Sequence, residues 1–197
     1  MYNDDELKIH LEPLAIWCKA EYIEQRVKRI NANDNKLELE DGSTVDYDIL
    51  AINIGSKTKG TLGVSGVFEH SLTTRPINDI LWKIKTREQE LLLIERIPVV
   101  AICGAGAAGT ELSFAFKKRW GDLFKADIPI NLISAEDEIM KYDCEPVRKL
   151  TVSKLQEKGI NIVTEGKVTK INSAGIVLHD GREIDCDVAI WATGAEA

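Results

Sequence analysis

From residue 98 onward the apolar positions of the chain follow two alternating periods. Short apolar runs, typical of buried strands, are each followed by a longer stretch in which apolar residues recur every three to four positions, as in a helix that buries one face. Strands and helices that alternate at this spacing predict right-handed β-α-β units and an α/β fold with a Rossmann-like parallel sheet. The expected strands are 98–103, 130–134 and 161–164, and the expected helices begin near residue 107 and after residue 143. The first helix is expected to bury Ala108, Leu112, Ala115 and Phe116.

The first half of the chain carries the same kinds of pattern in shorter pieces. A β-branched run that ends at Gly55 is typical of a buried strand, and a later stretch has the apolar spacing of an amphipathic helix that lies outside the sheet. An Asp41-Gly42 pair marks a tight turn between short strands. The expected elements are a helix at 12–19, a strand around Tyr22 and Ile23, short strands within 27–47, the buried strand 49–54 and the helix 78–95.

Part of this pattern occurs twice. Residues 37–55 align without gaps on residues 176–194, and six of the nineteen positions are identical, including the D-G turn and the final glycine. Each copy is typical of a β-hairpin that leads into a buried strand ending in glycine. Two unrelated hairpins with common turn chemistry would give some of these identities. Internal duplication is the favoured interpretation, because the closing strand and its glycine also recur in register.

The glycines of "CGAGAAG", residues 103–109, have the spacing G-x-G-x-x-G. They follow a predicted strand and open a predicted helix, which is the context that this spacing requires of a dinucleotide-binding loop. Gly104 is expected to permit the tight exit from the strand, Gly106 to leave room for a pyrophosphate, and Gly109 to let helix and strand pack closely. We therefore expect Gly104, Ala105, Gly106, Ala107, Ala108 and Gly109 to bind a dinucleotide, against the alternative of a purely structural turn.

The residue that should bind the adenosine ribose is unusual. Dinucleotide-binding domains commonly place an acidic residue about 20 positions beyond the glycines, at the end of the second strand. Ser134 occupies that position here, and the nearest acid is Glu136. A serine hydroxyl suits a ribose hydroxyl or a 2′-phosphate equally, whereas Glu136 would repel the phosphate. The pair favours NAD(H) over NADP(H) and leaves NADP(H) open.

Composition and charge limit the possible partners. The 197 residues are 44% hydrophobic and 29% charged, and the formal net charge is −7, with a pI of about 5.1. This charge gives no electrostatic reason to expect nucleic acid or an anionic membrane surface as a partner. No apolar run approaches the ~20 residues of a membrane-spanning helix, and the scattered His10, His70 and His179 suggest no metal site.

The cysteines are too far apart in sequence for a C-x-x-C redox pair, which suits a cytoplasmic or other reducing compartment. Each is expected to be a small buried hydrophobic residue. Peripheral membrane association of the intact protein stays open. The four are Cys18, Cys103, Cys144 and Cys186.

These features together resemble a known family. The chain is similar to the FAD-dependent pyridine nucleotide-disulfide oxidoreductases, in their NADH-dehydrogenase-like branch, and most of all to the flavoprotein domains fused to selenophosphate synthetases. The NAD-binding domain of that family resembles "VVAICGAGAAGTEL", "INLISAEDEIM", "GINIVTEGKVTKI" and "AIWATGAEA". The second half of its FAD domain resembles "KIHLEPLA", "DGSTVDYDILAINIGS" and "TTRPINDIL".

The resemblance implies an organisation for the chain. Residues 1–75 correspond to the second half of an FAD domain, residues 76–96 to a connecting helix, and residues 97–197 to an NAD(P)-binding Rossmann domain with a β-meander insertion. Family members have a further FAD-binding glycine motif upstream and an FAD-contacting strand downstream, so the sequence is expected to be a piece of a longer protein. Residues 1–75 would then expose apolar surface, through which a homodimer is possible.

The resemblance also implies a reaction. Family members pass hydride from a nicotinamide to FAD and on to an acceptor, which for this chain is expected to be a quinone or another small molecule. Glu111 matches a glutamate near the nicotinamide–flavin contact, although the helix dipole alone would favour an acid at what is expected to be the first helical turn. Thr193 and Gly194 match the cofactor-contacting end of the last strand. No catalytic residue is assigned firmly, and the piece alone is expected to be inactive. A non-catalytic NAD-binding module without flavin is the alternative, and a methyltransferase-like Rossmann domain is a more distant one.

Overall fold

The computed structural model describes residues 9–94 and 96–196. The chain forms two compact units, Met1–Ile54 and Gly55–Ala197. This division comes earlier in the sequence than the expected domain boundary after residue 75, because the segment between the two boundaries packs within the second unit. The assignment of residues 1–75, 76–96 and 97–197 to parts of an FAD domain, a connector and an NAD domain stays a prediction.

The centre of the second unit is a parallel five-stranded sheet, as the alternating pattern predicts. Its strand order is β5-β12-β6-β7-β8, and every neighbouring pair is parallel. The chain therefore runs outward from β6 through β7 to β8 and later returns to the other side of β6. The strands are β5 (Ser71–Thr73), β6 (Val100–Cys103), β7 (Ile130–Ile133), β8 (Ile160–Val163) and β12 (Val188–Trp191).

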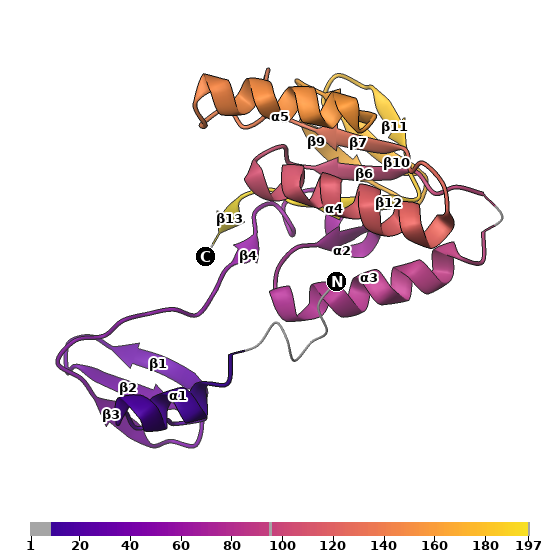
Figure 1. The fold of residues 1–197 in the computed structure, drawn as a ribbon. Coiled ribbons are helices and arrows are strands. Elements are labelled where there is room, and N and C mark those ends of the chain that lie inside the picture. Colours follow the sequence, from indigo (N-terminus) through magenta and orange to yellow (C-terminus); the bar gives the residue numbers. More distant parts are fainter. Residues whose placement is uncertain (1–8, 95, 197) are drawn as a thin grey trace. The chain divides into compact units, whose positions relative to one another are not determined.

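Helices cover one face of this sheet, as Figure 1 shows. Alternate residues of β6 point to opposite faces, as in any strand. Val100 and Ile102 therefore pack with the helices, in a buried cluster that includes Phe116 and Trp120. This cluster joins all three helices to the sheet. The helices are α3 (Ile77–Leu91), α4 (Ala107–Phe124) and α5 (Glu145–Glu157).

An antiparallel meander covers the opposite face. Ala101 and Cys103 of β6 pack there against Ile171, Ile176 and Leu178. Beyond the last sheet strand, the short strand β13 (Ala195–Glu196) pairs antiparallel with β4 (Lys57–Thr58). The result is a three-layer unit of helices, parallel sheet and meander. The meander strands are β9 (Val168–Ile171), β10 (Gly175–Leu178) and β11 (Glu183–Asp185), and the short helix α2 (Val67–His70) packs beside them.

The first unit is a smaller αβ structure. Its three strands form an antiparallel sheet of order β1-β2-β3, and the tight turn at Asp41-Gly42 joins the last two. The Asp41 carboxylate accepts hydrogen bonds from the backbone N–H and the hydroxyl of Ser43. The elements are α1 (Leu11–Cys18), β1 (Val27–Asn31), β2 (Lys36–Leu39) and β3 (Thr44–Asp46).

Two predicted strands of the first half are wrong. Tyr22 and Ile23 lie in irregular structure before β1. Residues 49–54 belong to no strand, and Ile49 and Ile54 are each 91% exposed. Their β-branched composition suits a buried strand, but no described strand lies beside them to complete a ladder. Burial therefore depends on neighbours that the local sequence does not contain.

The buried face of α4 also differs from the expected one. Ala108 and Ala115 are exposed, whereas Gly109, Ser113, Phe116 and Trp120 are buried. The buried stripe passes through a glycine because the helix approaches the sheet closely at that point. Of the four expected positions, Ala108 and Ala115 are thus wrong, whereas Phe116 is buried and Leu112 packs against the core as predicted.

The prediction that every cysteine is buried is half correct. Cys103 is buried and Cys186 is partly buried, whereas Cys18 and Cys144 are exposed, and all four thiols are free. Burial raises the pKa of the Cys186 thiol to about 12 and also raises that of Cys103.

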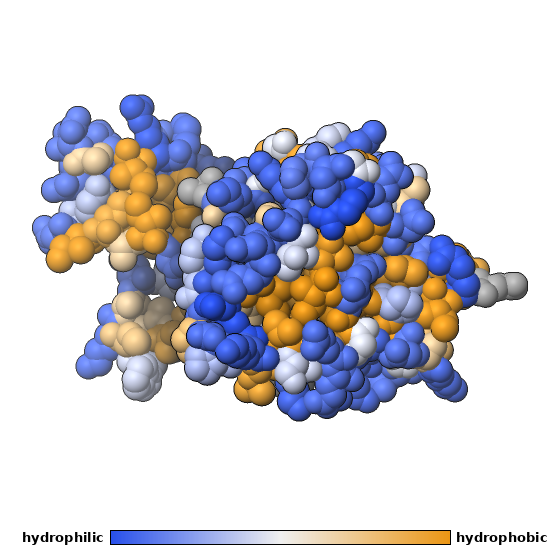
Figure 2. Space-filling view, turned by 90° about the horizontal axis from the view of Figure 1, so that it is seen from above, coloured by the Kyte–Doolittle hydropathy of each residue, from blue (hydrophilic) through white to orange (hydrophobic). Residues whose placement is uncertain are grey.

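Hydrophobic side chains are mixed with hydrophilic ones at the surface, as Figure 2 shows. No helix in the described part of the chain is long and apolar enough to cross a membrane.

Candidate functional site

The glycine loop leaves β6 at the point where the chain direction reverses across the sheet. The strands on the two sides of β6, β7 and β12, are reached by connections that run in opposite directions. In open parallel sheets, ligands bind in the crevice outside the carboxyl ends of the strands at such a switch point. Gly104 lies at this switch point, directly after β6, and its N–H donates to the carbonyl of Ile133 at the end of β7 at 2.9 Å. On the other side, the N–H of Ala192 after β12 donates to the carbonyl of Cys103 at 2.8 Å.

Each glycine of the loop has a different structural reason. Gly104 has a φ of +111°, and a Cβ there would lie 2.6 Å from the carbonyl oxygen of Ala192. A Cβ at Gly109 would lie 1.7 Å from the carbonyl oxygen of Gly104. At Gly106, by contrast, a Cβ would meet no heavy atom within 4 Å. The outer glycines are therefore required by close packing, whereas the space in front of Gly106 is open.

Helix α4 begins at the rim of that open space. Gly106 is its N-cap, and the Gly106 carbonyl accepts the N–H of Thr110 at 3.0 Å. The N–H groups of the first turn, from Ala107 to Gly109, have no carbonyl partner within the helix and point along its axis. Amides of this kind, together with the positive end of the helix dipole, are suited to bind an anion. Ala107 and Ala108 are exposed, so that their small side chains leave the amides accessible to a ligand. Ala105, in the same loop, is buried.

Glu111 lies further from the helix start than the sequence suggests. The first turn of α4 contains no acidic residue, and Glu111 is exposed in the next turn. The explanation by the helix dipole is weakened, because the dipole effect fades beyond the first turn. Beside it, the Thr110 hydroxyl is buried and has no hydrogen-bond partner among the described residues. The role of Glu111 near a nicotinamide stays a prediction.

Ser134 organises the loop that follows β7. Its hydroxyl donates to the carbonyl of Glu138 at 3.0 Å and accepts the N–H of Glu136 at 3.1 Å. A serine hydroxyl has a single proton, which is already used here. The loop is also bonded to the glycine loop, since the N–H of Met140 donates to the carbonyl of Ala105 at 2.8 Å. The two loops therefore form one continuous rim of the crevice.

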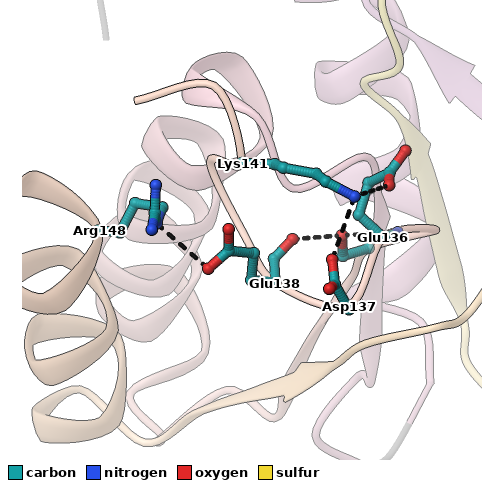
Figure 3. A network of polar contacts seen from close by, with 6 residues as sticks. Glu136, Asp137, Glu138, Lys141 and Arg148 are labelled. Carbon is teal, nitrogen blue, oxygen red and sulfur yellow. Dashed lines mark hydrogen bonds and ion pairs between the residues drawn. The ribbon is translucent and has the colours of Figure 1, made fainter. Parts of the chain in front are cut away.

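Charged side chains gather on this rim, as Figure 3 shows. The ammonium Nζ of Lys141 lies 2.7 Å from a carboxylate oxygen of Glu136 and 3.2 Å from one of Asp137. Arg148, on α5, lies 3.2 Å from the carboxylate of Glu138. Sequence reasoning considered Glu136 but missed its cationic partner. The sequence signal was that Lys141 follows Asp137 by four residues and Glu136 by five. This spacing brings the charges together because the loop folds back on itself.

The other side of the crevice is built from the end of β12. The Thr193 hydroxyl donates to the carbonyl of Lys59 at 2.6 Å, and the Trp191 indole N–H donates to the same oxygen at 2.7 Å. The Gly194 carbonyl accepts the N–H of Lys59 at 2.7 Å. The predicted Thr193 and Gly194 are thus bonded to a segment more than a hundred residues earlier, and sequence reasoning did not connect Lys59 and Trp191 with the site.

The arrangement suits binding of an anionic, extended ligand. It combines a helix N-terminus, an open glycine and a rim of charged groups at the reversal point of a parallel sheet. Of the predicted site residues, those from Gly104 to Gly109 form the turn and the start of α4, Ser134 and Glu136 lie on the adjoining loop, and Thr193 and Gly194 follow the neighbouring strand β12. These residues offer a binding cradle, with no arrangement of nucleophile and base.

The chain is similar to a known family and to curated proteins of that kind. The pyridine nucleotide-disulphide oxidoreductase family matches residues 19–197. A type II NADH:quinone oxidoreductase of Haemophilus influenzae is 26% identical over 180 residues, which cover 78% of this chain and 40% of the relative. A mitochondrial internal alternative NAD(P)H-ubiquinone oxidoreductase of Arabidopsis thaliana is 25% identical over 169 residues, covering 76% and 32%. The chain thus spans less than half the length of each of these relatives.

Solved structures share the fold over most of the chain. A ferredoxin reductase from Rhodopseudomonas palustris superposes with a TM-score of 0.79 at 19% identity, over 97% of this chain and 45% of the other. NDH2 from Plasmodium falciparum, solved in complex with NADH, gives a TM-score of 0.71 at 20% identity, over 89% and 41%. The resemblance to domains fused to selenophosphate synthetases stays a prediction.

Proposed function

Because the chain belongs to the pyridine nucleotide-disulphide oxidoreductase family, we propose that its glycine loop binds the pyrophosphate of NAD(H). We propose further that the intact protein passes hydride from NADH to FAD and on to a quinone or another small acceptor. In this proposal residues 97–197 are the nicotinamide-nucleotide domain, residues 76–96 connect it, and residues 1–75 belong to the flavin domain.

The observation that carries the proposal is the contrast among the three glycines. A Cβ is excluded by backbone at Gly104 and Gly109, whereas a Cβ at Gly106 would meet no heavy atom within 4 Å. A merely structural turn would have no reason to keep that middle position open in front of a helix N-terminus. A pyrophosphate needs both the open space and the amide donors.

Each predicted binding residue has a part in this proposal. The amides of Ala107, Ala108 and Gly109 would bind the pyrophosphate, and the rim that Ser134 organises would face the adenosine ribose. Glu111 would approach the nicotinamide, and Thr193 and Gly194 would border it from the end of β12. The bound nucleotide would supply the hydride chemistry, and the protein would supply binding and orientation.

The flavin and the acceptor are proposed for the intact protein. The described residues hold one glycine loop of this kind, so we assign it to NAD(H) and derive no step through FAD in this chain. Quinones are favoured as acceptors because the similar curated proteins are described as quinone reductases. A reducing compartment fits the four free thiols.

Nucleotide binding can be tested on the chain as it stands. NADH titration, followed by nucleotide fluorescence, is expected to saturate with the wild type and to show a loss of at least about tenfold in affinity with Gly106→Val. The side chain would occupy the space proposed for the pyrophosphate, and the backbone φ of −79° at Gly106 accepts valine without strain. Circular dichroism checks that the variant folds.

Gly63→Val is the matched control, because a Cβ at Gly63 also meets no heavy atom within 4 Å. It should leave NADH affinity unchanged. Equal affinity of folded Gly106→Val and wild type would show that the loop is structural and would overturn the binding proposal.

Electron transfer needs a separate test on protein that includes any coding sequence adjoining this chain. We expect flavin absorbance that NADH bleaches and an added quinone restores. A colourless protein that still binds NADH would refute the oxidoreductase proposal and favour a non-catalytic NAD-binding module.

A further inference from the structure

The charged rim beside the glycine loop contains a cation that is held by two carboxylates. Lys141 bridges Glu136 and Asp137 at 2.7 and 3.2 Å. These two carboxylates raise the pKa of Lys141, and Lys141 in turn lowers the pKa of Asp137. The Asp137 carboxylate and the Lys141 ammonium are thus held in their charged forms.

The backbone around this bridge is fixed. The Glu136 N–H donates to the Ser134 hydroxyl, and the Glu136 carbonyl accepts the N–H of Glu165 at 2.8 Å. Met140, the residue before Lys141, has a φ of +48° and is bonded to the carbonyl of Ala105. A non-glycine residue in this left-handed region is uncommon and needs support from its surroundings. The glycine loop therefore holds the residue that precedes Lys141 in place.

The side chains of the bridge are, in contrast, easily rearranged. All three are substantially exposed, and exposed ion pairs contribute little to stability and exchange readily with other partners. Lys141 is thus a cation beside the proposed ribose end of the crevice. Its ion-pair partners among the described residues are the carboxylates of Glu136 and Asp137.

The charge of the rim opposes a 2′-phosphate. Glu136, Asp137 and Glu138 supply three negative charges, and Lys141 and Arg148 supply two positive ones. Arg148 is occupied by Glu138 and by the carbonyl of Asp143. The rim therefore has one net negative charge, and a phosphate monoester would add about two more.

We propose that Lys141 is a specificity-determining residue of the nucleotide site. Its bridge to Glu136 and Asp137 leaves the rim negative and favours NAD(H), and removing the two carboxylates makes Lys141 a binding partner for a 2′-phosphate. This inference rests on the proposed function, since it assumes that a dinucleotide occupies the crevice. It assigns the preference for NAD(H) to the charges around Lys141 and not to Ser134, because the Ser134 hydroxyl already donates its proton to the carbonyl of Glu138.

The test compares two pairs of probes, and the members of each pair differ only in the 2′-phosphate. Adenosine 5′-monophosphate and adenosine 2′,5′-bisphosphate are titrated against the full chain at low salt by calorimetry, and NADH and NADPH are titrated by fluorescence. Glu136→Gln/Asp137→Asn is expected to raise affinity for the 2′-phosphorylated probes by about tenfold. Affinity for the probes without a 2′-phosphate should change far less, and the gain in affinity for the 2′-phosphorylated probes should shrink as salt screens the charges.

A second variant separates charge from loop structure. Adding Lys141→Met to the double variant should abolish the gain for 2′-phosphorylated probes, and Lys141→Arg in its place should retain it. Lys154→Met is the matched control, because Lys154 also bridges a nearby carboxylate, that of Glu157, on helix α5. This control should leave the ratio of the two affinities unchanged.

Three results would contradict the inference in distinguishable ways. If the double variant binds both kinds of probe with an unchanged ratio, Lys141 does not determine specificity, although nucleotide binding stands. If the gain survives Lys141→Met, another cation is responsible. If the wild type binds none of the four probes, the proposed function itself fails.

Discussion

Gly106 and Gly109 are expected to respond differently to substitution by alanine, because their surroundings differ. Alanine within a helix usually stabilises a protein relative to glycine, by about 1 kcal/mol. Gly109 lies within α4, yet a Cβ there would lie 1.7 Å from a backbone oxygen. The helix would have to move off the sheet to accommodate it.

We therefore expect Gly109→Ala to lower the free energy of unfolding by about 2–3 kcal/mol, the upper part of the usual range for overpacking. Gly106→Ala should change it by less than about 1 kcal/mol, because its Cβ meets no atom. Urea unfolding followed by circular dichroism measures both. A Gly109→Ala variant as stable as the wild type would show that α4 approaches the sheet less closely than the structure indicates.

At the scale of elements, a buried carboxylate joins two helices behind the site. Glu88 of α3 accepts hydrogen bonds from the Arg119 guanidinium at 2.6 and 2.7 Å and from the Trp120 indole N–H at 2.7 Å. Glu88 is 8% exposed. Both donors belong to α4, the helix whose N-terminus forms the proposed anion site. The contact fixes the C-terminal part of α4 against α3.

Removal of this carboxylate would leave a partly buried guanidinium and a buried indole N–H without partners. We expect Glu88→Ala to lower the free energy of unfolding by about 3–5 kcal/mol, as is typical when one member of a buried pair is removed. Glu90→Ala is the control: Glu90 is exposed and pairs with Arg87, so the cost should be at most about 1 kcal/mol. Thermal or urea unfolding of the two variants measures both losses of unfolding free energy. Equal losses in Glu88→Ala and Glu90→Ala would contradict the role given to Glu88.

The repeated segments also agree at the scale of elements. In the first unit Leu37 pairs with Val45, and in the second Ile176 pairs with Ile184, at the same alignment positions. The first strand of each meander, β1 or β9, skips one residue at the corresponding place of its pairing, between Val27 and Arg29 in one copy and between Val168 and Lys170 in the other. A shared register and a shared irregularity are expected of duplicated segments and support that interpretation over common turn chemistry.

At the scale of the whole molecule, the two copies of the repeat end in opposite surroundings. Residues 188–191 of the second copy form β12, at the interior of the five-stranded sheet, and are buried. The aligned residues 49–52 of the first copy form no strand, and all of them except Leu50 are exposed. Contiguous exposed apolar residues favour association with another surface. A second copy of this chain is one such surface, and the homodimer stays a prediction.

Equivalent substitutions in the two copies should therefore have different effects. Val188→Asp is expected to prevent folding of the second unit, because it places an unpaired charge in the core. Ile49→Asp, at the same repeat position, should change the free energy of unfolding by less than about 0.5 kcal/mol. It should also reduce self-association in sedimentation velocity. A wild type that remains monomeric at all concentrations would contradict the expected association.

Local patterns determined much of this protein. The alternation of strands and helices predicted the parallel sheet, the D-G turns predicted the hairpins, and the glycine spacing predicted the loop at the end of β6. Each of these depends on interactions within a few residues: backbone preference, turn chemistry, and one element packing on the next. The repeat was likewise visible in the sequence alone.

Only the tertiary structure decided the features that depend on distant residues. It left residues 49–52 mostly exposed while burying the equivalent 188–191, because burial requires neighbouring strands and not merely apolar side chains. It placed Lys59 against Thr193, and it folded the loop after β7 so that Lys141 reached Glu136 and Asp137. The sequence contains the residues of such sites, but their electrostatics and packing depend on which of them the fold brings within a few ångströms of one another.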